Sequence, residues 1–296
     1  MSLKKCYNWE KIMGGGVVSQ EKYLKILKKL RLIDDAFFSA CFDDNVDDVQ
    51  YILRIILEKD DLKVLKVETQ KSVENLYGRS VRFDVFATDT KGKKYNIEVQ
   101  RADSGAIPQR ARYNSVMLDY HELKKQDEFK ELPESFVVFI TENDVIGDGL
   151  KIYHADRIIR ETNKELGDGT HIIYVNGAYK GEKGKPLDDL IHDFFCDNPK
   201  DMRHRQLAKR VEFFKENKIG VSSMSSIIAE FFKDEIATAA QQAAKEAAEK
   251  AEAETKQNTL IESIRNLMET YELTATQAMD ALKVPANEQN KYLALI

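Results

Sequence analysis

Two acidic residues, Asp84 and Glu98, lie on two short segments whose side chains alternate between apolar and polar. In residues 81–87 the apolar side chains alternate with polar ones that include Asp84, and residues 95–100 show the same alternation around Glu98. A period of two is typical of a β-strand with one buried face. The polar residues 88–94 between the segments include a glycine and predict a hairpin loop.

The hairpin would place Asp84 directly opposite Glu98 if its loop is centred on Lys91. Opposed residues on one face of a sheet have Cβ atoms about 5 Å apart, a distance at which two carboxylates repel each other. A divalent cation between them would remove the repulsion. A metal with carboxylate ligands and bound water also suits the hydrolysis of a phosphodiester. The alternative for each residue is an ordinary solvated acid on the polar face of a strand.

A helix with two arginines is predicted directly after the hairpin. Pro108 suits the first turn of a helix, and the helical pattern continues to about Lys125. Arg110 and Arg112 lie early in this helix, next to Tyr113. The guanidinium group offers a planar fork of donors that matches phosphate. These three residues are therefore candidates for contact with DNA, Arg110 first among them, and the alternative is an ordinary exposed helix surface.

These motifs resemble those of the PD-(D/E)XK nuclease family transposases, the recombination-promoting branch of the restriction-endonuclease-like superfamily. The resemblance extends from about Leu32 to about Lys215 and rests on the sequence around Asp84, on Glu98-Val99-Gln100, on Arg110-Ala111-Arg112-Tyr113 and on Asp35-Ala36-Phe37-Phe38. Arg82-Phe83 stands where the motif of the superfamily has its opening proline.

The resemblance implies that Asp84 and Glu98 hold Mg²⁺, with Mn²⁺ as a substitute, and that the backbone carbonyl of Val99 is a further ligand. The last motif position in the superfamily is typically Lys, whereas this chain has Gln100. Gln can orient the attacking water through hydrogen bonds but carries no charge, so activation of the water would fall to the metal. The resemblance also makes Asp35 a further acid near the metal; the alternative is an acid favoured by the dipole at a helix N-terminus.

The composition describes a well-charged globular chain and excludes several classes of protein. The 296 residues are 43% hydrophobic and 32% charged, and the net charge of -5 excludes a globally basic nucleic-acid coat. The three cysteines form no CxxC pair and the histidines no HxxxH pattern, which disfavours zinc or a disulfide framework and favours a reducing compartment. No signal-peptide pattern and no apolar run of about 20 residues is present. We therefore expect a cytoplasmic protein without a membrane anchor.

The predicted elements around the hairpin form an α-β-β-β-α-β core, the layout of the restriction-endonuclease-like fold. This α/β fold has a central mixed sheet flanked by helices. Helices are predicted over residues 20–32, 35–42, 46–57 and 187–196, and further strands over 62–73, 136–140 and 171–175. The run 136–140 is continuously apolar, which is typical of a strand buried on both faces. Basic residues in 20–32 and 203–210 could contact phosphate, but solvated helix faces explain them as well.

The C-terminal region differs in composition from the rest. Residues 233–256 are rich in Ala, Glu and Lys and lack Gly and Pro, which predicts a long exposed helix acting as a semi-rigid spacer. Short helices are predicted over 260–268 and 274–282, the second opened by a capping box at Thr274. This pair resembles a small helix-turn-helix, although its few basic residues suit an interaction tail equally well. The expected division is a flexible segment 1–19, a nuclease-like domain 20–232, a spacer 233–257 and a helical tail 258–296.

Three functions are consistent with these patterns. The first is a metal-dependent DNA endonuclease acting in transposition or recombination, with Asp84, Glu98 and Gln100 as catalytic residues. The second is a catalytically inactive nuclease-fold protein that binds DNA or a protein partner; Gln100 favours it, and the presence of both carboxylates speaks against it. The third is a structural protein whose charged helix assembles homo-oligomers.

Overall fold

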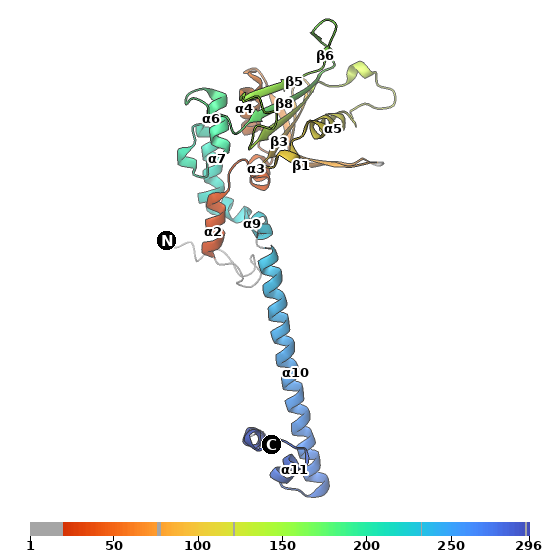
Figure 1. The fold of residues 1–296 in the computed structure, drawn as a ribbon, viewed down its shortest axis with the longest axis vertical. Coiled ribbons are helices and arrows are strands. Elements are labelled where there is room, and N and C mark those ends of the chain that lie inside the picture. The colour runs from red at the N-terminus through yellow and green to blue at the C-terminus, as the bar shows by residue number, and fades with distance from the viewer. Residues whose placement is uncertain (1–19, 76–77, 121, 232, 294) are drawn as a thin grey trace. The chain divides into compact units, whose positions relative to one another are not determined.

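The computed structural model describes residues 20–75, 78–120, 122–231, 233–293 and 295–296 (Figure 1). The segment 1–19, predicted to be flexible, lies outside the described residues. The chain forms two compact units, one containing the described residues up to Phe231 and the other those from Lys233 onward. Each unit has a hydrophobic core of its own.

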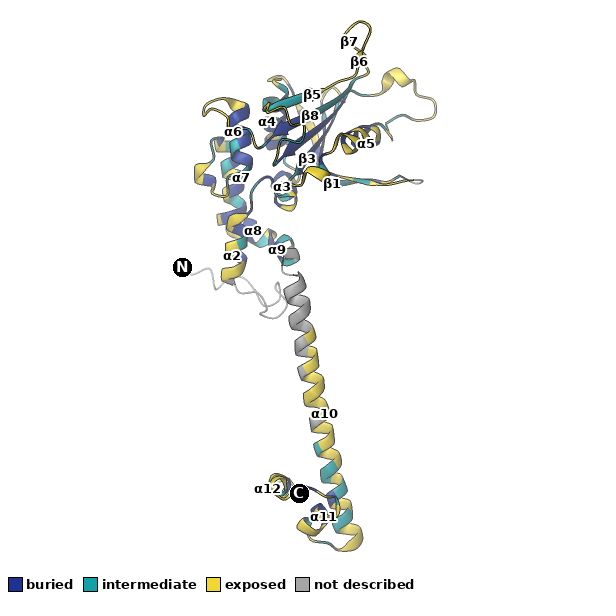
Figure 2. Cartoon of the chain, viewed as in Figure 1, coloured by how far each residue is buried: buried dark blue, intermediate teal, exposed yellow. Residues whose placement is uncertain are grey.

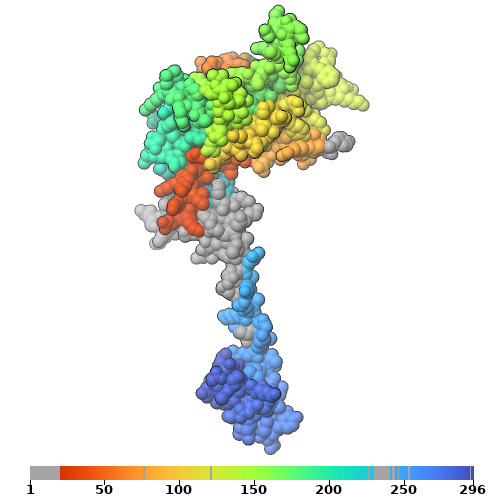
Figure 3. Space-filling view, in the orientation of Figure 1, coloured from red at the N-terminus to blue at the C-terminus, as the bar shows by residue number. Residues whose placement is uncertain are grey.

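The first unit is built on a six-stranded mixed sheet with the order β1-β2-β3-β4-β8-β5. These strands span, in chain order, Val64–Val73, Val81–Asp89, Lys94–Gln100, Ser135–Thr141, Ile152–Ala155 for β5 and Thr170–Asn176 for β8. β1, β2 and β3 are antiparallel neighbours, β4 and β8 continue parallel to β3, and β5 is antiparallel at the edge. The α/β class and the restriction-endonuclease-like core are thereby confirmed. A short hairpin of β6 (Ile158–Ile159) and β7 (Lys164–Glu165) stands out from the surface (Figure 3).

Buried strands and the helices over them make up the core of this unit. β4 is buried along its whole length, as its continuous apolar run predicts, and its neighbour β3 is buried over all but its two end residues (Figure 2). Successive side chains of a strand point to opposite faces. Val137 and Phe139 pack with residues of α5 (Pro108–Asp119), so the equally buried Val138 and Ile140 point to the other face.

Two helices predicted before the first strand have the expected bounds. α3 (Asp35–Phe42) contacts β1, β2 and β3, and α4 (Val46–Leu57) contacts β1. The side chain of Asn45 caps α4 by accepting a hydrogen bond from the Asp48 N–H at 3.2 Å. The remaining helices of the unit are α2 (Gln20–Lys29), α6 (Pro186–Phe194), α7 (Arg205–Glu216), α8 (Lys218–Ser223) and α9 (Ser225–Phe231), with 3-10 turns η2 (Asp103–Gly105), η3 (Phe129–Glu131) and η4 (Pro199–Asp201).

The helix after the hairpin is shorter than predicted, since α5 ends at Asp119 and not near Lys125. Beyond it the chain turns: the Glu122 N–H bonds to the Asp119 carbonyl at 3.1 Å, and the Asp127 carboxylate accepts from the Lys124 N–H at 2.8 Å. Local bonds from an Asp side chain offer the backbone an alternative to the helix.

One lysine of α7 is buried and ties distant segments together. The Lys215 Nζ donates to the carbonyls of Lys28, at 2.9 Å, of Leu30 and of Asp197. Burial lowers the pKa of Lys215 to about 8. This ammonium group joins the ends of α2 and α7 and the loop after α6.

The second unit consists of α10 (Lys233–Tyr271), α11 (Ala275–Ala281) and α12 (Ala286–Leu293). The prediction of a separate helix over 260–268 is wrong, because α10 continues through it and its sequence contains neither Gly nor Pro to interrupt it. The capping box at Thr274 is confirmed. The far part of α10 packs with α11 and α12 around Ile264, Met279 and Tyr292. None of the described helices has the length and the apolar character that a membrane crossing requires.

Candidate metal centre

The two acids of the hairpin lie side by side at the end of the β2–β3 pair. The register pairs Val85 with Ile97, and its continuation by one residue sets Asp84 opposite Glu98. The Val99 N–H donates to the Asp84 Oδ2 at 3.1 Å. Asp84 is 7% exposed and Glu98 1% exposed, so both carboxyl groups have left bulk water.

A third acid, Asp35, approaches the pair from the first turn of α3. Burial raises the pKa of Asp84 to about 9, and the charges of Glu98 and Asp35 add to the rise, while the Val99 N–H opposes it. Burial likewise raises the pKa of Glu98 to about 7, although the Asn96 side chain, the charge of Arg110 and the Asp84 N–H act to lower it. Burial disfavours the charged form of a carboxyl group and so raises its pKa, and neighbouring negative charge adds to the rise.

Arg110 of α5 contacts both Glu98 and Gln100. Its Nη2 lies 3.3 Å from the Glu98 Oε2, and its Nη1 donates to the Gln100 Oε1 at 3.3 Å. The positive charge that Gln100 cannot supply is therefore present beside it, ten positions further along the chain. The sequence suggested Arg110 for phosphate contact only, and no local pattern indicates its approach to Glu98.

The other oxygen of Glu98 is buried and has no hydrogen-bond partner among the described residues. An unpaired buried carboxylate oxygen is costly. The donor set of Asp84, Glu98 and the neighbouring Asp35 consists of hard oxygens, the kind that Mg²⁺ and Mn²⁺ take. Charge crowding and the unpaired oxygen both fit a divalent cation at this place.

The carbonyl of Val99 is directed to the same side as these acids. In an extended strand the N–H and C=O groups of one residue face the same neighbour, and the Val99 N–H faces Asp84. The backbone therefore presents the Val99 oxygen toward β2, on the side where the family resemblance implies a ligand.

Gln100 is held by a close approach of the chain that the sequence did not suggest. A Cβ atom at Gly105, in η2, would lie 2.1 Å from the Gln100 Cδ. Only a residue without a side chain leaves room for the amide in its position. Gly105 and Arg110 thus confine Gln100 from two sides.

Arg112 and Tyr113 do not join this group through any contact seen among the described residues. Arg112 is exposed on α5. The Tyr113 hydroxyl donates to the Arg79 carbonyl and accepts from the Asn75 Nδ2 at 3.3 Å. It therefore connects α5 to the segment between β1 and β2.

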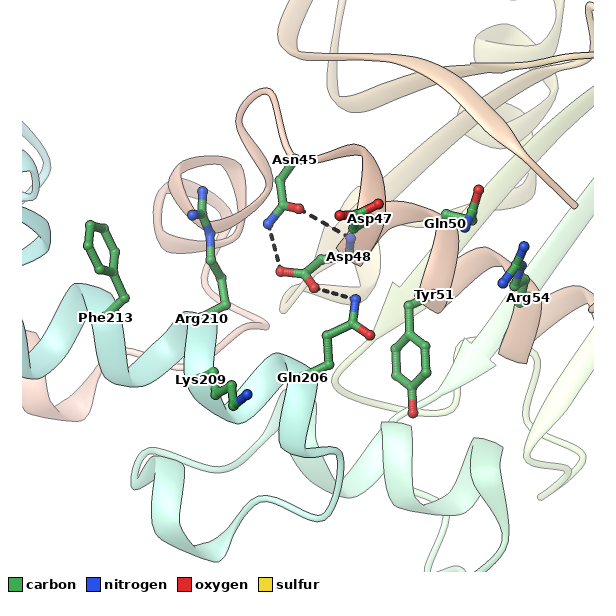
Figure 4. A pocket seen from close by; sticks show the side chains of 10 residues that line it. All are labelled: Asn45, Asp47, Asp48, Gln50, Tyr51, Arg54, Gln206, Lys209, Arg210 and Phe213. Atoms are coloured by element: carbon green, nitrogen blue, oxygen red, sulfur yellow. Dashed lines mark hydrogen bonds between the residues drawn. The ribbon is translucent and has the colours of Figure 1, made fainter.

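A cleft of about 630 Å³ between α4 and α7 is separate from these acids (Figure 4). Its lining residues are Asn45, Asp47, Asp48, Gln50, Tyr51, Arg54, Gln206, Lys209, Arg210 and Phe213. The buried acid of this cleft, Asp48, accepts from the Asn45 Nδ2 and the Gln206 Nε2, each at 2.6 Å. Both oxygens of Asp48 are thus paired, whereas only one oxygen of Glu98 is.

A second group of metal-ligand types lies on and after α6. Among the described residues, only His192, Asp193 and Cys196 bring three such ligand atoms within 4.8 Å of one another, so Asp35, Asp84 and Glu98 are more loosely grouped. Asp193 already accepts from the N–H groups of Arg203 and His204, each at 2.7 Å, and lies 2.9 Å from the His204 Nδ1. A metal there would compete with these bonds, which disfavours it.

Comparison with known proteins agrees with the fold. Residues 38–180 match the family model described as PD-(D/E)XK nuclease family transposase. Comparisons with curated proteins and with solved structures gave no match. The matched segment runs from α3 to just after β8 and includes Asp84, Glu98, Gln100 and Arg110. The chain therefore carries, across residues 38–180, a domain of the PD-(D/E)XK nuclease family transposases.

Proposed function

We propose that the protein is a metal-dependent DNA endonuclease that acts in transposition or recombination. The observation that supports this most is the pair of buried carboxylates, Asp84 and Glu98, whose pKa values burial raises to about 9 and about 7. A group of acids that lacks positive charge binds a divalent cation readily, because the cation removes the repulsion within the group. The family match makes a nuclease the fitting chemistry.

Asp84, Glu98 and the Val99 carbonyl would hold Mg²⁺ or Mn²⁺, with Asp35 next to them. When bound, the metal supplies an acidified water and stabilises negative charge on the phosphate. The Gln100 amide would orient the attacking water through hydrogen bonds. Arg110, which pairs with Glu98 and Gln100, would turn its donors to a phosphate oxygen of the DNA, since the metal would take over its role at Glu98.

Cleavage of a supercoiled plasmid tests the proposal. Purified protein is incubated with DNA and Mg²⁺ or Mn²⁺, beside Asp84→Asn and Glu98→Gln. We expect the parent to nick or linearise the plasmid and both variants to lose at least about 100-fold in rate, since loss of metal ligands exceeds the 10- to 100-fold cost of losing their supporting contacts. The exchange Asp61→Asn, of an exposed acid, is the control. Intact DNA with the parent, or undiminished cutting by Asp84→Asn, would overturn the assignment.

The runner-up is a nuclease-fold protein that binds DNA or a partner without cutting. The uncharged Gln100 favours it, as does the engagement of Arg110 with Glu98. Fluorescence anisotropy with labelled DNA separates the two functions: tight binding that is indifferent to Mg²⁺, without cleavage in either metal, supports the inactive form.

For the second unit we propose an interaction tail in preference to a DNA reader. Residues 258–296 contain five acids and three bases, which disfavours contact with a phosphate backbone. The Arg265 Nη2 is also engaged, donating to the Leu295 carbonyl at 3.0 Å. Sedimentation of the full chain beside one that ends at Phe231 would show whether this unit brings copies of the chain together.

A further inference from the structure

A strained residue of β1, Gln70, lies next to the acids. The flanking pairs Thr69 with Val85 and Lys71 with Phe83 set Gln70 opposite Asp84. Its φ is +50°, and among the described non-glycine residues with positive φ it alone lies within a strand. This left-handed conformation costs free energy for any residue with a Cβ. Such strain persists where the surrounding structure enforces it and often marks a functional site.

The strained backbone aims the Gln70 side chain at α3. Its Nε2 donates to the Asp35 Oδ1 at 3.2 Å and to the Ser39 Oγ. The Ser39 hydroxyl, which is buried, lies 3.5 Å from the same Asp35 oxygen. One oxygen of Asp35 is therefore held by an uncharged donor from β1.

The Gln70 contact restricts a carboxylate that is otherwise free to turn to water. Asp35 is exposed, and besides its bond to Gln70 its side chain shares a hydrogen bond with Asp84. Because the Gln70 amide binds one oxygen of Asp35, the other oxygen can face a cation. The bond also limits rotation of the Asp35 side chain, so less conformational entropy is lost when a cation binds.

We propose that Gln70 is a positioning residue, which holds Asp35 beside Asp84 so that this third carboxylate takes part in binding a divalent cation. The inference rests on the proposed function, because it assumes that the acids bind a metal. It differs from a purely structural role, in which the amide only ties β1 to α3.

The test measures the affinity for Mn²⁺ in the absence of DNA, by the loss of the free-ion signal in electron paramagnetic resonance. The variants are Gln70→Gly, Asp35→Asn and the double variant, made in the full chain. Glycine adopts the φ of position 70 without strain, so the strand is retained. We expect Gln70→Gly to weaken Mn²⁺ binding about 10-fold and to add less than twofold in the Asp35→Asn background, because it acts through Asp35.

Glu58→Gly is the matched control. Glu58 has a φ of +52° and ends α4 as an exposed residue, so glycine relieves the same strain away from the acids. We expect an unchanged Mn²⁺ affinity. Thermal unfolding of each variant verifies that it is folded.

The outcomes distinguish a failure of the Gln70 role from a failure of the proposed metal centre. If the parent binds Mn²⁺ and Asp84→Asn does not, but Gln70→Gly binds within twofold of the parent, the role of Gln70 is refuted and the metal centre stands. Equal, independent losses from Gln70→Gly and Asp35→Asn likewise refute positioning through Asp35. If the parent itself binds no Mn²⁺, or Asp84→Asn binds as well, the proposed function fails first.

Discussion

Asp193 and Asp84 are both buried carboxylates, but their surroundings act on them in opposite directions. Burial acts to raise the pKa of Asp193, yet hydrogen bonds from His204 and from the N–H groups of Arg203 and His204 hold that pKa below its usual value. The pKa of Asp84 is raised to about 9 by burial and neighbouring acids. Burial alone thus does not mark a functional acid; the supply of donors around it does.

The contrast separates a carboxylate saturated with hydrogen bonds from the pair that we propose as metal ligands. Asp193 organises the turn that leads into α7, and every bond it makes would be lost to an incoming metal. Asp84 accepts from the Val99 N–H, and Glu98 pairs one oxygen with Arg110 but keeps the other unpaired within the described part of the chain. A cation would therefore stabilise the second site and disturb the first.

The same substitution at the two positions should have opposite effects on stability. Asp193→Asn turns an amide N–H toward donors and breaks a buried network, which costs about 3–5 kcal/mol and lowers the Tm by about 6–20 °C. Asp84→Asn should raise the Tm at pH 7 without metal, because the raised pKa of Asp84 makes folding take up a proton at that pH, a cost that Asn does not carry. Circular dichroism melts of both variants check this. A lower Tm for both variants would contradict the difference that we infer between Asp193 and Asp84.

The pH dependence of stability should show the deficient acids directly. A raised folded-state pKa means that the native state binds its proton more tightly than the unfolded chain does. Asp84 and Glu98 therefore contribute stability below about pH 4 that is lost as the pH rises through about 7 for Glu98 and about 9 for Asp84. We expect metal-free protein to lose stability steadily between pH 5 and 9 relative to Asp84→Asn, and saturating Ca²⁺ to restore it. If the stability of the parent and of Asp84→Asn depended on pH in the same way, the raised pKa of Asp84 would be contradicted.

Arg110 forms an ion pair with Glu98 and a hydrogen bond with Gln100, so its removal should affect catalysis more than folding. We expect Arg110→Ala to lower the rate of DNA cleavage about 100-fold, with Arg110→Lys between it and the parent because Lys keeps the charge but not the fork. Arg112→Ala, on the exposed part of the same helix, is the control and should weaken DNA binding with little change in kcat. Cleavage kinetics at saturating DNA give both values; equal kcat for Arg110→Ala and the parent would remove Arg110 from the centre.

Gly105→Ala should produce the smallest effect. The added Cβ displaces the Gln100 amide, which lies 2.1 Å from it at the nearest atom, while the backbone at Gly105 has no positive φ. We expect about 10-fold slower cleavage with a Tm close to that of the parent. A parent-like rate would show that the position of Gln100 is unimportant, and a large fall in Tm would show that the contact is structural.

Much of the fold follows from local sequence. The bounds of α3 and α4, the fully buried β4 and the capping box at Thr274 follow from periodicity, burial pattern and capping residues. Two predicted helix ends are wrong. α5 ends at Asp119, and beyond it the Asp127 side chain bonds to the backbone of Lys124. α10 continues past the predicted break because its sequence contains neither Gly nor Pro.

The candidate metal centre likewise contains contacts that the sequence predicts and contacts that only the tertiary structure shows. The sequence by itself determined that Asp84 and Glu98 oppose each other, because alternation and loop length set the register of a hairpin. Only the tertiary structure decided that Arg110 comes beside Gln100, that Gln70 holds Asp35 at the cost of a strained φ, and that the acid of α6 is saturated with donors. These contacts join segments whose separation along the chain leaves no period or motif, and they form only when helices pack on the finished sheet.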